Sequence, residues 1–469
     1  MFIERFEDKG LSQYSYGVAC EGAGAVAIVD PRRDVDVYVD FASDRGLRIS
    51  HVLETHIHAD YASGAKELAE RTGAALCLSA YDEGELYDVR FPHREMRDGD
   101  AVTIGAVRIE AQHTPGHTPE HLSFLVYDTR RAATVPMVML SGDFLFVGSL
   151  GRPDLLGEDA KLGLAKRLYA SVRDKLASLP DGLEIAPAHG AGSMCGAGMS
   201  GRAVSTLGFE RVANPYLDPT LDEPAFVARI LGHVPPFPDY YRRMKVLNSE
   251  GPPTLDGVPG LTGIAAPQFR ALAEADHMVI DLRDQLSFGA GHVPGAFGIV
   301  AGSGVSTWAS WVVPYDRPLL LVGHDRAQIE QAARSLVRVG LDDIRGYLHG
   351  GMDAWIRAGY PMTHTSQMAA TSLERRMASG EEFTVVDVRA ADEWRSGHIA
   401  GALHVMGGDL PSRVDELRGR SGTIALVCAS GFRSTVAASV LERAGIANVV
   451  NVTGGMVAWR QAGFPVVGH

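Results

Sequence analysis

The stretch Gly397-His-Ile-Ala-Gly-Ala402 occurs a second time in this sequence, slightly changed, as Gly291-His-Val-Pro-Gly-Ala296. Two further motifs recur in the same order at nearly the same offset; the pairs are Asp281-Leu-Arg283 with Asp387-Val-Arg389, and Gly350-Gly-Met-Asp-Ala-Trp355 with Gly454-Gly-Met-Val-Ala-Trp459. Three recurring motifs in one order indicate an internal duplication. We therefore predict two copies of one domain, over residues 258–362 and 368–469.

Each copy alternates short apolar runs with helical patterns. In the second copy, residues 384–387, 424–427 and 449–452 are predicted strands, and residues 434–444 are a predicted helix. Strands that alternate with helices are typical of a parallel sheet covered by helices. We predict this fold for both copies, with a Gly- and Pro-rich linker at residues 251–260 before the first.

Residues 1–250 follow a different pattern. Residues 16–20, 25–29 and 49–54 are predicted strands, and residues 35–45 are a predicted helix. We predict a separate α/β domain here, so the whole chain is α/β and multidomain. Its 469 residues suffice for three domains, since one domain holds about 150 residues.

The composition excludes several classes of function. The 44 Lys+Arg residues face 57 Asp+Glu residues, a net charge of −13, so we expect no nucleic-acid binding and no attraction to anionic membranes. No apolar run reaches the about 20 residues that span a bilayer. The N-terminus is too charged for a signal peptide and the four cysteines are scattered, so we expect a cytoplasmic protein without disulfides.

Four motifs with metal-binding residue types follow predicted strands of the first domain. They are Thr55-His56-Ile-His58-Ala-Asp60, Thr114-Pro-Gly-His117, Ser141-Gly-Asp143 and Ala186-Pro-Ala-His189. Side chains at strand–loop junctions are held firmly enough to bind a metal. Each motif alone has an ordinary structural explanation, and we keep that explanation for His51, His113 and His121.

Taken together and in this order, the motifs resemble the metallo-β-lactamase superfamily over essentially the whole first domain. The resemblance implies an αββα sandwich. Dinuclear hydrolases of this superfamily, such as glyoxalase II, have a histidine directly after the first motif, where this chain has Tyr61. Because a phenol with a pKa of about 10 is a poor ligand at neutral pH, we expect a single metal.

Residues 55–64, 142–154 and 187–196 look like persulfide dioxygenases. That family implies one non-haem Fe(II) per chain, held by two histidines and one aspartate. Such a triad leaves positions open for O₂ and a thiolate-like substrate. The ligands carried over by motif are His56, His117 and Asp143.

The resemblance gives the remaining polar residues of these motifs supporting roles. His58 supports the ligands or is an alternative ligand, and Asp60, Tyr61 and His189 surround the iron or are remnants of a second site.

Two residues near these motifs have alternative interpretations. Arg152 forms an ion pair with Asp154 that stabilises its own turn, or it binds substrate. Cys195 is a buried inert thiol, or it carries a persulfide close to His189.

The second copy contains Cys428-Ala429-Ser430-Gly431-Phe432-Arg433-Ser434 between a predicted strand and a predicted helix. Backbone N–H groups and the helix dipole at a helix start stabilise a thiolate or persulfide anion, and Arg433 adds a positive charge. With the recurring motifs, this loop resembles rhodanese. The resemblance implies that Cys428 is the sulfur-carrying nucleophile, that Arg433 assists it, and that the other loop residues form the cradle.

The first copy lacks this chemistry. When residues 319–322 are aligned with residues 424–427, Gly323 stands where Cys428 stands, and His324-Asp-Arg326 replaces the rest of the loop. Without a thiol there is no persulfide intermediate. We interpret this copy as a scaffold or docking module.

The whole chain resembles multidomain persulfide dioxygenase–sulfurtransferases. The implied activity oxidises a small-molecule persulfide of glutathione, CoA or a similar thiol with O₂ to sulfite, which Cys428 then converts to thiosulfate, for sulfide detoxification. Alternatives are a zinc thioester hydrolase of glyoxalase II type with a sulfurtransferase domain, and a persulfide-sensing protein. The thiol carrier, the direction of sulfur transfer and any homo-oligomer stay open.

Overall fold

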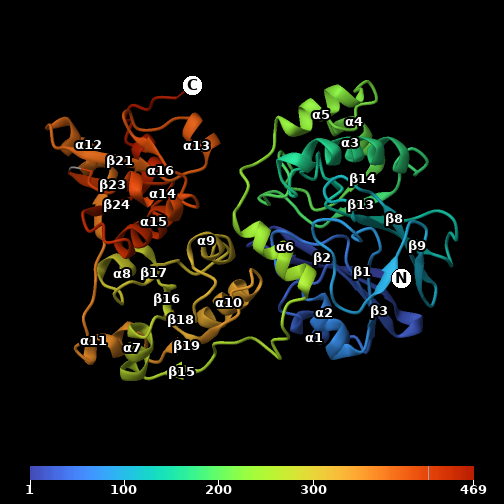
Figure 1. The fold of residues 1–469 in the computed structure, drawn as a ribbon, viewed down its shortest axis with the longest axis horizontal. Coiled ribbons are helices and arrows are strands. Elements are labelled where there is room, and N and C mark those ends of the chain that lie inside the picture. Colours follow the sequence, from blue (N-terminus) through green and yellow to red (C-terminus); the bar gives the residue numbers. More distant parts are fainter. Residues whose placement is uncertain (421, 469) are drawn as a thin grey trace. The chain divides into compact units, whose positions relative to one another are not determined.

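The computed structural model describes residues 1–420 and 422–468. The chain divides into two compact units, one of residues 1–257 with 337–340 and one of residues 258–336 with 341–469 (Figure 1). Residue 469, the end of the third predicted domain, lies outside the described residues. The predicted domain boundaries stay a proposal.

The first unit contains two six-stranded mixed sheets. The first has the order β1-β2-β3-β4-β5-β6, namely Phe2–Asp8, Gln13–Cys20, Ala25–Val29, Arg48–Leu53, Ala75–Ser79 and Arg94–Met96. The second has the order β14-β13-β10-β9-β8-β7, namely Ser205–Thr206, Glu184–Pro187, Val138–Gly142, Leu122–Asp128, Val107–His113 and Ala101–Ile104. A short hairpin of β11 (Leu145–Phe146) and β12 (Ser149–Leu150) stands apart.

Three hydrophobic layers hold these sheets and their helices together. The central core joins side chains of both sheets, and β2 is buried at every position. Helices α1 (Asp36–Asp44) and α2 (Ala65–Thr72) cover the outer face of the first sheet. Helices α3 (Glu158–Lys175) and α5 (Glu223–Leu231) cover the second (Figure 1). This order of layers confirms the αββα sandwich.

The last residue of each predicted metal motif lies after the end of a strand. His56 follows β4, His117 follows β8, Asp143 follows β10 and His189 follows β13. The unit also contains α4 (Leu207–Ala213) and α6 (Tyr240–Glu250). Both β4 and the β10–β13 pair lie inside their sheets, so these strand ends are rigidly anchored.

The second unit contains two five-stranded sheets in which every pairing is parallel. The first has the order β15-β19-β18-β16-β17, namely Gly263–Ile264, Ile344–Leu348, Leu319–Val322, Met278–Asp281 and Phe297–Gly298. The second has the order β20-β24-β23-β21-β22, namely Ser366–Ala369, Val449–Thr453, Thr423–Val427, Phe383–Asp387 and Leu403–His404. The matching order confirms the duplicated parallel fold.

Helices of matching position accompany each sheet. Those of the first copy are α7 (Ala266–Glu274), α8 (Gln285–Ala290), α9 (Val305–Val312), α10 (Arg326–Val337) and α11 (Gly351–Arg357). Those of the second are α12 (Ala370–Ala378), α13 (Ala391–Arg395), α14 (Leu410–Arg413), α15 (Phe432–Arg443) and α16 (Gly455–Gln461). Within the described residues, every helix falls short of the length and apolar character that crossing a bilayer demands.

Candidate functional site

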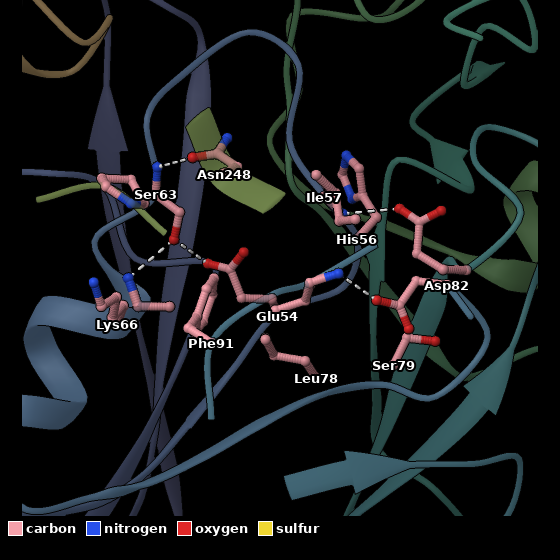
Figure 2. A pocket seen from close by; sticks show the side chains of 14 residues that line it. Glu54, His56, Ile57, Ser63, Lys66, Leu78, Ser79, Asp82, Phe91 and Asn248 are labelled. Atoms are coloured by element: carbon pink, nitrogen blue, oxygen red, sulfur yellow. Dashed lines mark hydrogen bonds between the residues drawn. The ribbon is translucent and has the colours of Figure 1, made fainter. Parts of the chain in front are cut away.

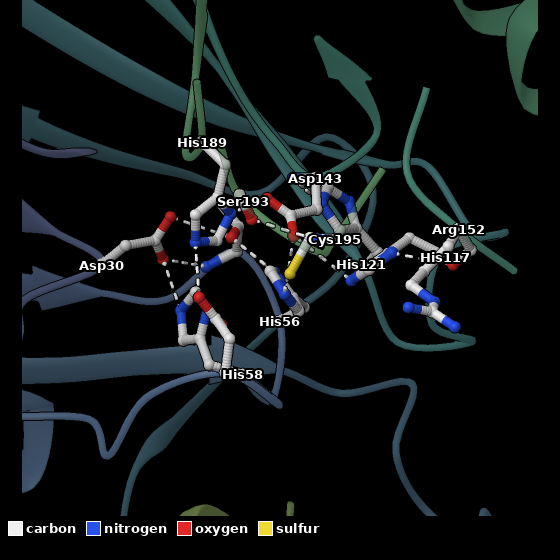
Figure 3. A network of polar contacts seen from close by, with 12 residues as sticks. Asp30, His56, His58, His117, His121, Asp143, Arg152, His189, Ser193 and Cys195 are labelled. Carbon is white, nitrogen blue, oxygen red and sulfur yellow. Dashed lines mark hydrogen bonds and ion pairs between the residues drawn. The ribbon is translucent and has the colours of Figure 1, made fainter. Parts of the chain in front are cut away.

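Three buried side chains of the first unit converge on one point (Figure 3). The Nε2 atoms of His56 and His117 lie 3.8 Å and 3.4 Å from Oδ2 of Asp143. All three atoms are buried, and none has a hydrogen-bond partner among the described residues. Buried polar atoms without partners are costly unless a ligand satisfies them. The group therefore fits a metal held by two imidazoles and one carboxylate.

Hydrogen bonds behind the two imidazoles leave both Nε2 atoms free to bind a cation. Thr55 Oγ1 donates to a carboxylate oxygen of Asp30 at 2.9 Å, so it accepts from Nδ1 of His56, also at 2.9 Å. Nδ1 of His117 donates to the carbonyl oxygen of Arg152 at 2.9 Å. With the proton on Nδ1, each ring has a lone pair on Nε2.

Burial also keeps both rings neutral. Desolvation lowers the pKa of His56 and His117 well below the usual histidine value, and neighbouring histidines lower it further. Neutral imidazole is the form that binds a metal, so the protonation state agrees with the geometry.

His189 fixes the orientation of Asp143 from the opposite side. Its Nδ1 donates to Oδ1 of Asp143 at 2.7 Å, and its Nε2 lies 2.7 Å from Oδ2 of Asp60. Burial opposes a charge on this ring, but the two carboxylates outweigh burial and raise the pKa of His189 well above its usual value. Because Oδ1 of Asp143 is occupied, Oδ2 is the oxygen left to face His56 and His117.

His58 and Tyr61 face a second buried acidic group. His58 Nε2 lies 3.3 Å from Asp30 Oδ1 and 3.8 Å from Glu54 Oε2, whereas its Nδ1 is buried and unpaired within the described chain. The Tyr61 hydroxyl donates to the Asp30 carbonyl oxygen at 3.2 Å. Burial, with nearby carboxylates, raises the pKa of Tyr61 well above its usual value. Tyr61 is thus a neutral donor. That His58 is an alternative ligand stays a prediction, because His58 groups with Asp30 and Glu54 and not with His56, His117 and Asp143.

His121 and Glu120 position the ligand loops, although sequence reasoning gave neither a role. The backbone N–H of Asp143 donates to Nε2 of His121 at 3.0 Å, and Thr114 Oγ1 lies 2.9 Å from its Nδ1. Glu120 Oε1 accepts the backbone N–H of Ile57 at 2.9 Å. Their closeness to His117 in the sequence was the one signal that could have drawn attention to them.

Asn248 of α6 holds the loop that carries His56 and His58. Its side-chain amide donates to the carbonyl oxygens of His58 and Tyr61, both at 2.8 Å, and accepts from the Ser63 backbone N–H at 2.8 Å. A small pocket beside this loop is lined by His56, Asn248 and twelve further residues (Figure 2). Nothing in the local sequence of α6 signals this role, because its partners lie far away in the chain.

Arg152 uses all five of its N–H donors within its own surroundings. It bonds both carboxylate oxygens of Asp154, at 2.7 Å and 2.8 Å, and the carbonyl oxygens of Met194, Pro235 and Pro236. This pattern is typical of a residue that stabilises a turn. Its carbonyl oxygen, not its guanidinium, contacts the metal centre through His117.

Cys195 is buried next to the same centre. Its Sγ lies 3.8 Å from the Tyr241 hydroxyl, and ligand atoms of Cys195, Asp60 and His189 lie within 4.8 Å of one another. Burial first, then Asp60 and Asp143, raises the pKa of the Cys195 thiol well above its usual value. The thiol form is therefore favoured in this arrangement.

In the second unit, Cys428 lies in a cradle between β23 and α15. Its Sγ accepts the backbone N–H of Gly431 at 3.1 Å and lies 3.3 Å from the Ser434 hydroxyl. Gly431 has φ +111°, a left-handed conformation that favours glycine. The carbonyl oxygens of Cys428, Ala429 and Ser430 accept backbone N–H groups from residues 454–457, which fixes the loop. The cradle can stabilise an anionic sulfur.

The predicted assisting arginine is held by an acidic partner. Arg433 makes two hydrogen bonds to the carboxylate of Glu393 on α13, the longer at 2.8 Å. The sequence offered no sign of Glu393, since an acidic residue in the first turn of a short helix is usually a solvated cap. The ion pair fixes the position of the Arg433 guanidinium.

In the first copy a glutamine occupies the corresponding loop. The Oε1 of Gln328 accepts the backbone N–H of His324 at 2.7 Å, and a Cβ added to Gly323 would meet this oxygen at 2.7 Å. Gln328 stands at the position of Arg433 in the alignment. The loop is therefore filled by the protein's own side chain.

Comparison with known proteins follows the same division of the chain. The family profile described as the metallo-β-lactamase superfamily matches residues 9–189, and that of the rhodanese-like domain matches residues 265–358 and 369–462. A solved metallo-β-lactamase from Staphylococcus aureus subsp. aureus COL is 34% identical, with a TM-score of 0.67, and the match covers 74% of this chain and 98% of that one.

Curated relatives match about half of the chain. A probable metallo-hydrolase of Burkholderia pseudomallei is 30% identical over 49% of this chain and 84% of its own length. The mitochondrial persulfide dioxygenase of Bos taurus is 28% identical over 47% of this chain and 77% of its own length. A hydroxyacylglutathione hydrolase of Polaromonas is 27% identical over 51% of this chain and 93% of its own length. The chain therefore belongs to the metallo-β-lactamase superfamily, with persulfide dioxygenase homologues and with two rhodanese-like domains after its metallo-β-lactamase domain.

Proposed function

We propose that the first unit is an iron-dependent persulfide dioxygenase and that Cys428 carries out a coupled sulfurtransferase reaction. The observation that carries this proposal is the set of three unpartnered buried atoms, Nε2 of His56, Nε2 of His117 and Oδ2 of Asp143. Two neutral imidazoles and a carboxylate suit Fe(II) with open coordination positions. The persulfide dioxygenase among the relatives supports this choice of chemistry.

The protein's own residues prepare this site for one Fe(II) per chain. Thr55 and the Arg152 carbonyl fix the tautomers of His56 and His117, and His189 holds Asp143. When bound, iron would supply the redox chemistry by which O₂, with water, converts the terminal sulfur of a persulfide R–S–SH to sulfite, while the S–S bond breaks and the thiol R–SH is released. The substrate is a small-molecule persulfide, such as that of glutathione or CoA.

Cys428 completes the reaction sequence. In its cradle the thiolate takes a sulfane sulfur from a donor R–S–S⁻ and releases R–S⁻; sulfite then takes that sulfur to give thiosulfate and restores the thiolate. Gly431 and Ser434 contact Sγ of Cys428, the sulfur that carries the charge in the thiolate. In the persulfide the charge lies on the outer sulfur. This sequence would remove sulfide-derived sulfur as thiosulfate.

A zinc thioester hydrolase is the second candidate. One observation favours it: Asp60, His189 and Cys195 bring three further ligand atoms within 4.8 Å of one another, next to Asp143, and could hold a second metal. Hydroxyacylglutathione hydrolases also occur among the relatives. Tyr61, a neutral buried donor to Asp30, argues against this candidate because it replaces a histidine ligand.

Oxygen uptake with glutathione persulfide separates these candidates. We expect uptake that follows iron content and not zinc content, and that Asp143→Ala abolishes. Asp154→Ala is the matched control, since Asp154 pairs with Arg152 and not with the metal group. A zinc-loaded, iron-free protein that hydrolyses a glutathione thioester and takes up no oxygen would contradict the proposal.

The coupling of the two sites is tested by their products. Cys428→Ser should leave oxygen uptake largely intact and shift the product from thiosulfate to sulfite, because Cys428 lies outside the metal group. The sulfite-to-thiosulfate ratio at fixed oxygen consumption measures this shift. An unchanged ratio would mean that thiosulfate arises in the first unit.

A further inference from the structure

Helix α6 turns three polar side chains to one face. Tyr241, Lys245 and Asn248 are spaced four and three residues apart, which places them along one side of a helix. All three are buried, at 1%, 2% and 4% exposure. A polar stripe on the buried side of a helix requires partners, and the partners show what this face is for.

Two of the three side chains contact residues close to the candidate metal centre. Asn248 bonds the backbone of the loop that carries His58 and Tyr61. Tyr241 contacts the Sγ of Cys195, which groups with Asp60 and His189. Lys245 lies between Tyr241 and Asn248 on the same face, and its ammonium is close enough to His56 and His117 to contribute to the lowering of their pKa.

The positive charge of Lys245 is only partly balanced by neighbouring carboxylates. Among the described residues, Glu120 is the one carboxylate within 4.0 Å of its Nζ, and Glu120 Oε1 already accepts the Ile57 N–H. The face of the Tyr87 ring lies 5.9 Å away. An ammonium has three donors, and a buried charge with a single distant partner is expensive to maintain.

The charges around Lys245 are those of the site. Burial lowers the pKa of Lys245, while Glu120 first, and then Cys195, Asp143 and Asp60, oppose that effect. The ammonium thus lies within electrostatic reach of the buried carboxylates of Asp143 and Asp60.

We propose that Lys245 is the positive group that binds the anionic sulfur of the substrate beside the candidate metal centre. The inference rests on the proposed function, since it names a residue that recognises the persulfide. Lys245 would recognise a compact sulfur anion. Both the terminal sulfur of an ionised persulfide and the sulfite product are such anions.

The competing explanation is that Lys245 only neutralises Glu120. The two explanations differ when both charges are removed together. A neutralising lysine is dispensable once Glu120 is uncharged, whereas a substrate-binding lysine is not. Lys245→Met with Glu120→Gln is therefore the decisive variant, and the introduced amide would keep an oxygen for the Ile57 N–H. The double variant also avoids leaving a buried carboxylate unpaired.

The measurements use full-length, iron-loaded protein with Cys428→Ser as background, so that the rhodanese site cannot consume sulfite. Iron content reports the integrity of the site. Sulfite is the binding probe, with its Kd measured by calorimetry, and the KM and kcat of oxygen uptake with glutathione persulfide are measured in parallel. The variants are Lys245→Met, Lys245→Arg, Glu120→Gln and the double variant. A change in the persulfide KM reports recognition of the substrate anion, and a change in the sulfite Kd reports recognition of the product anion.

We expect normal iron content and a rise in KM, in sulfite Kd or in both of about tenfold or more for Lys245→Met and for the double variant, with a smaller change in kcat. Lys245→Arg should stay within about threefold of the background protein, because it keeps the positive charge. Glu120 also anchors the Ile57 N–H, so the single variant Glu120→Gln measures how much of any change in the double variant comes from Glu120 itself. If Lys245→Met loses iron, the KM and sulfite Kd of the double variant decide between the two explanations.

Background values of both KM and sulfite Kd in the double variant would overturn the inference and leave Lys245 as a partner of Glu120. Failure of the proposed function has a different signature. In that case the background protein takes up no oxygen with the persulfide, yet the loss of sulfite binding on removing Lys245 still shows an anion site there.

Discussion

The two rhodanese-like copies of this chain keep the same scaffold. In each, an aspartate at a strand end bonds the arginine two residues later in the same bidentate geometry, at 2.9 Å and 2.6 Å, for Asp281 with Arg283 and for Asp387 with Arg389. In each, a buried tryptophan donates its indole N–H to a proline carbonyl oxygen at 2.9 Å. These contacts explain why the recurring motifs survive in both copies.

The copies differ in every side chain that surrounds the reactive sulfur. Aligned positions have Gly323 for Cys428, Gln328 for Arg433, Ile329 for Ser434, Ser287 for Glu393 and Tyr347 for Asn451. The first copy therefore lacks both members of the Arg433–Glu393 ion pair. It also lacks both the Ser434 hydroxyl and the Asn451 amide, which bond each other beside Cys428. The fold and the sulfur chemistry of these domains therefore depend on separate sets of residues.

The largest expected effect follows from the thiol itself. Cys428→Ser should reduce cyanide-dependent thiocyanate release by about a thousandfold or more, because no other group in the cradle can hold a sulfane sulfur. Mass spectrometry after sulfur loading should show a persulfide on Cys428 and none between residues 258 and 362.

Introducing a cysteine into the first copy tests whether its loop can support sulfur transfer. Gly323→Cys in the Cys428→Ser background should not restore activity, because Gln328 Oε1 lies 2.7 Å from the new Cβ and no counterpart of Ser434 contacts the sulfur. Thiocyanate release by that variant, or a persulfide mapped to position 323, would mean that the first copy kept a working cradle.

The second effect concerns Arg433. Arg433→Ala should lower the rate of thiosulfate formation about tenfold to a hundredfold, since one charge-assisted interaction with the anionic sulfur or with sulfite is lost while the backbone cradle stays. Gln328→Ala is the matched control in the first copy and should leave the rate unchanged. Equal rates for Arg433→Ala and the unmodified protein would assign Arg433 to the ion pair with Glu393 alone.

The fold was predictable because its determinants are local or repeated. Motif spacing identified the duplication, and alternating apolar runs identified the strands that the structure shows at β21, β23 and β24. The histidines and aspartates that follow strands were found for the same reason, since a strand end places its next residues at the edge of a sheet.

The supporting residues were not predictable in this way. Asn248 lies nearly two hundred residues after the loop that it supports, and in sequence α6 is a charged helix with no sign of which face is buried. Gln328 is likewise an ordinary first-turn glutamine until the loop closes around it. Their roles depend on tertiary packing, which no local pattern records.

The third effect concerns Ser434. Its hydroxyl lies 3.3 Å from Cys428 Sγ and 2.6 Å from Asn451 Oδ1. Ser434→Ala should slow sulfur transfer about fivefold, because it removes the hydroxyl that lies beside the sulfur and donates to Asn451, an interaction of about 1 kcal/mol. Ser439→Ala is the matched control on the same helix, because that hydroxyl bonds only the Val436 carbonyl oxygen. Equal rates for both variants would show that the backbone N–H of Gly431 suffices for the sulfur.

The smallest effect separates the copies by pH. The hydrogen bonds from Arg433 lower the pKa of Glu393, so this carboxylate stabilises the folded second copy above its unfolded pKa of about 4.5 and loses that effect as the pH falls through the lowered value. Because the pair is partly exposed, we expect less than about 1 kcal/mol.

Glu393→Gln should therefore reduce the hydrogen-exchange protection of α13 about two- to fivefold at pH 7, and the difference should close as the pH approaches 3. Helix α8 is an internal reference in the same molecule, since Ser287 replaces the carboxylate there and its protection should be identical in both proteins at every pH. A difference at α13 that stays constant with pH would show that Glu393 acts through packing or through its bond to the Ala390 N–H, and that the charge pair missing from the first copy contributes nothing to the stability of the second.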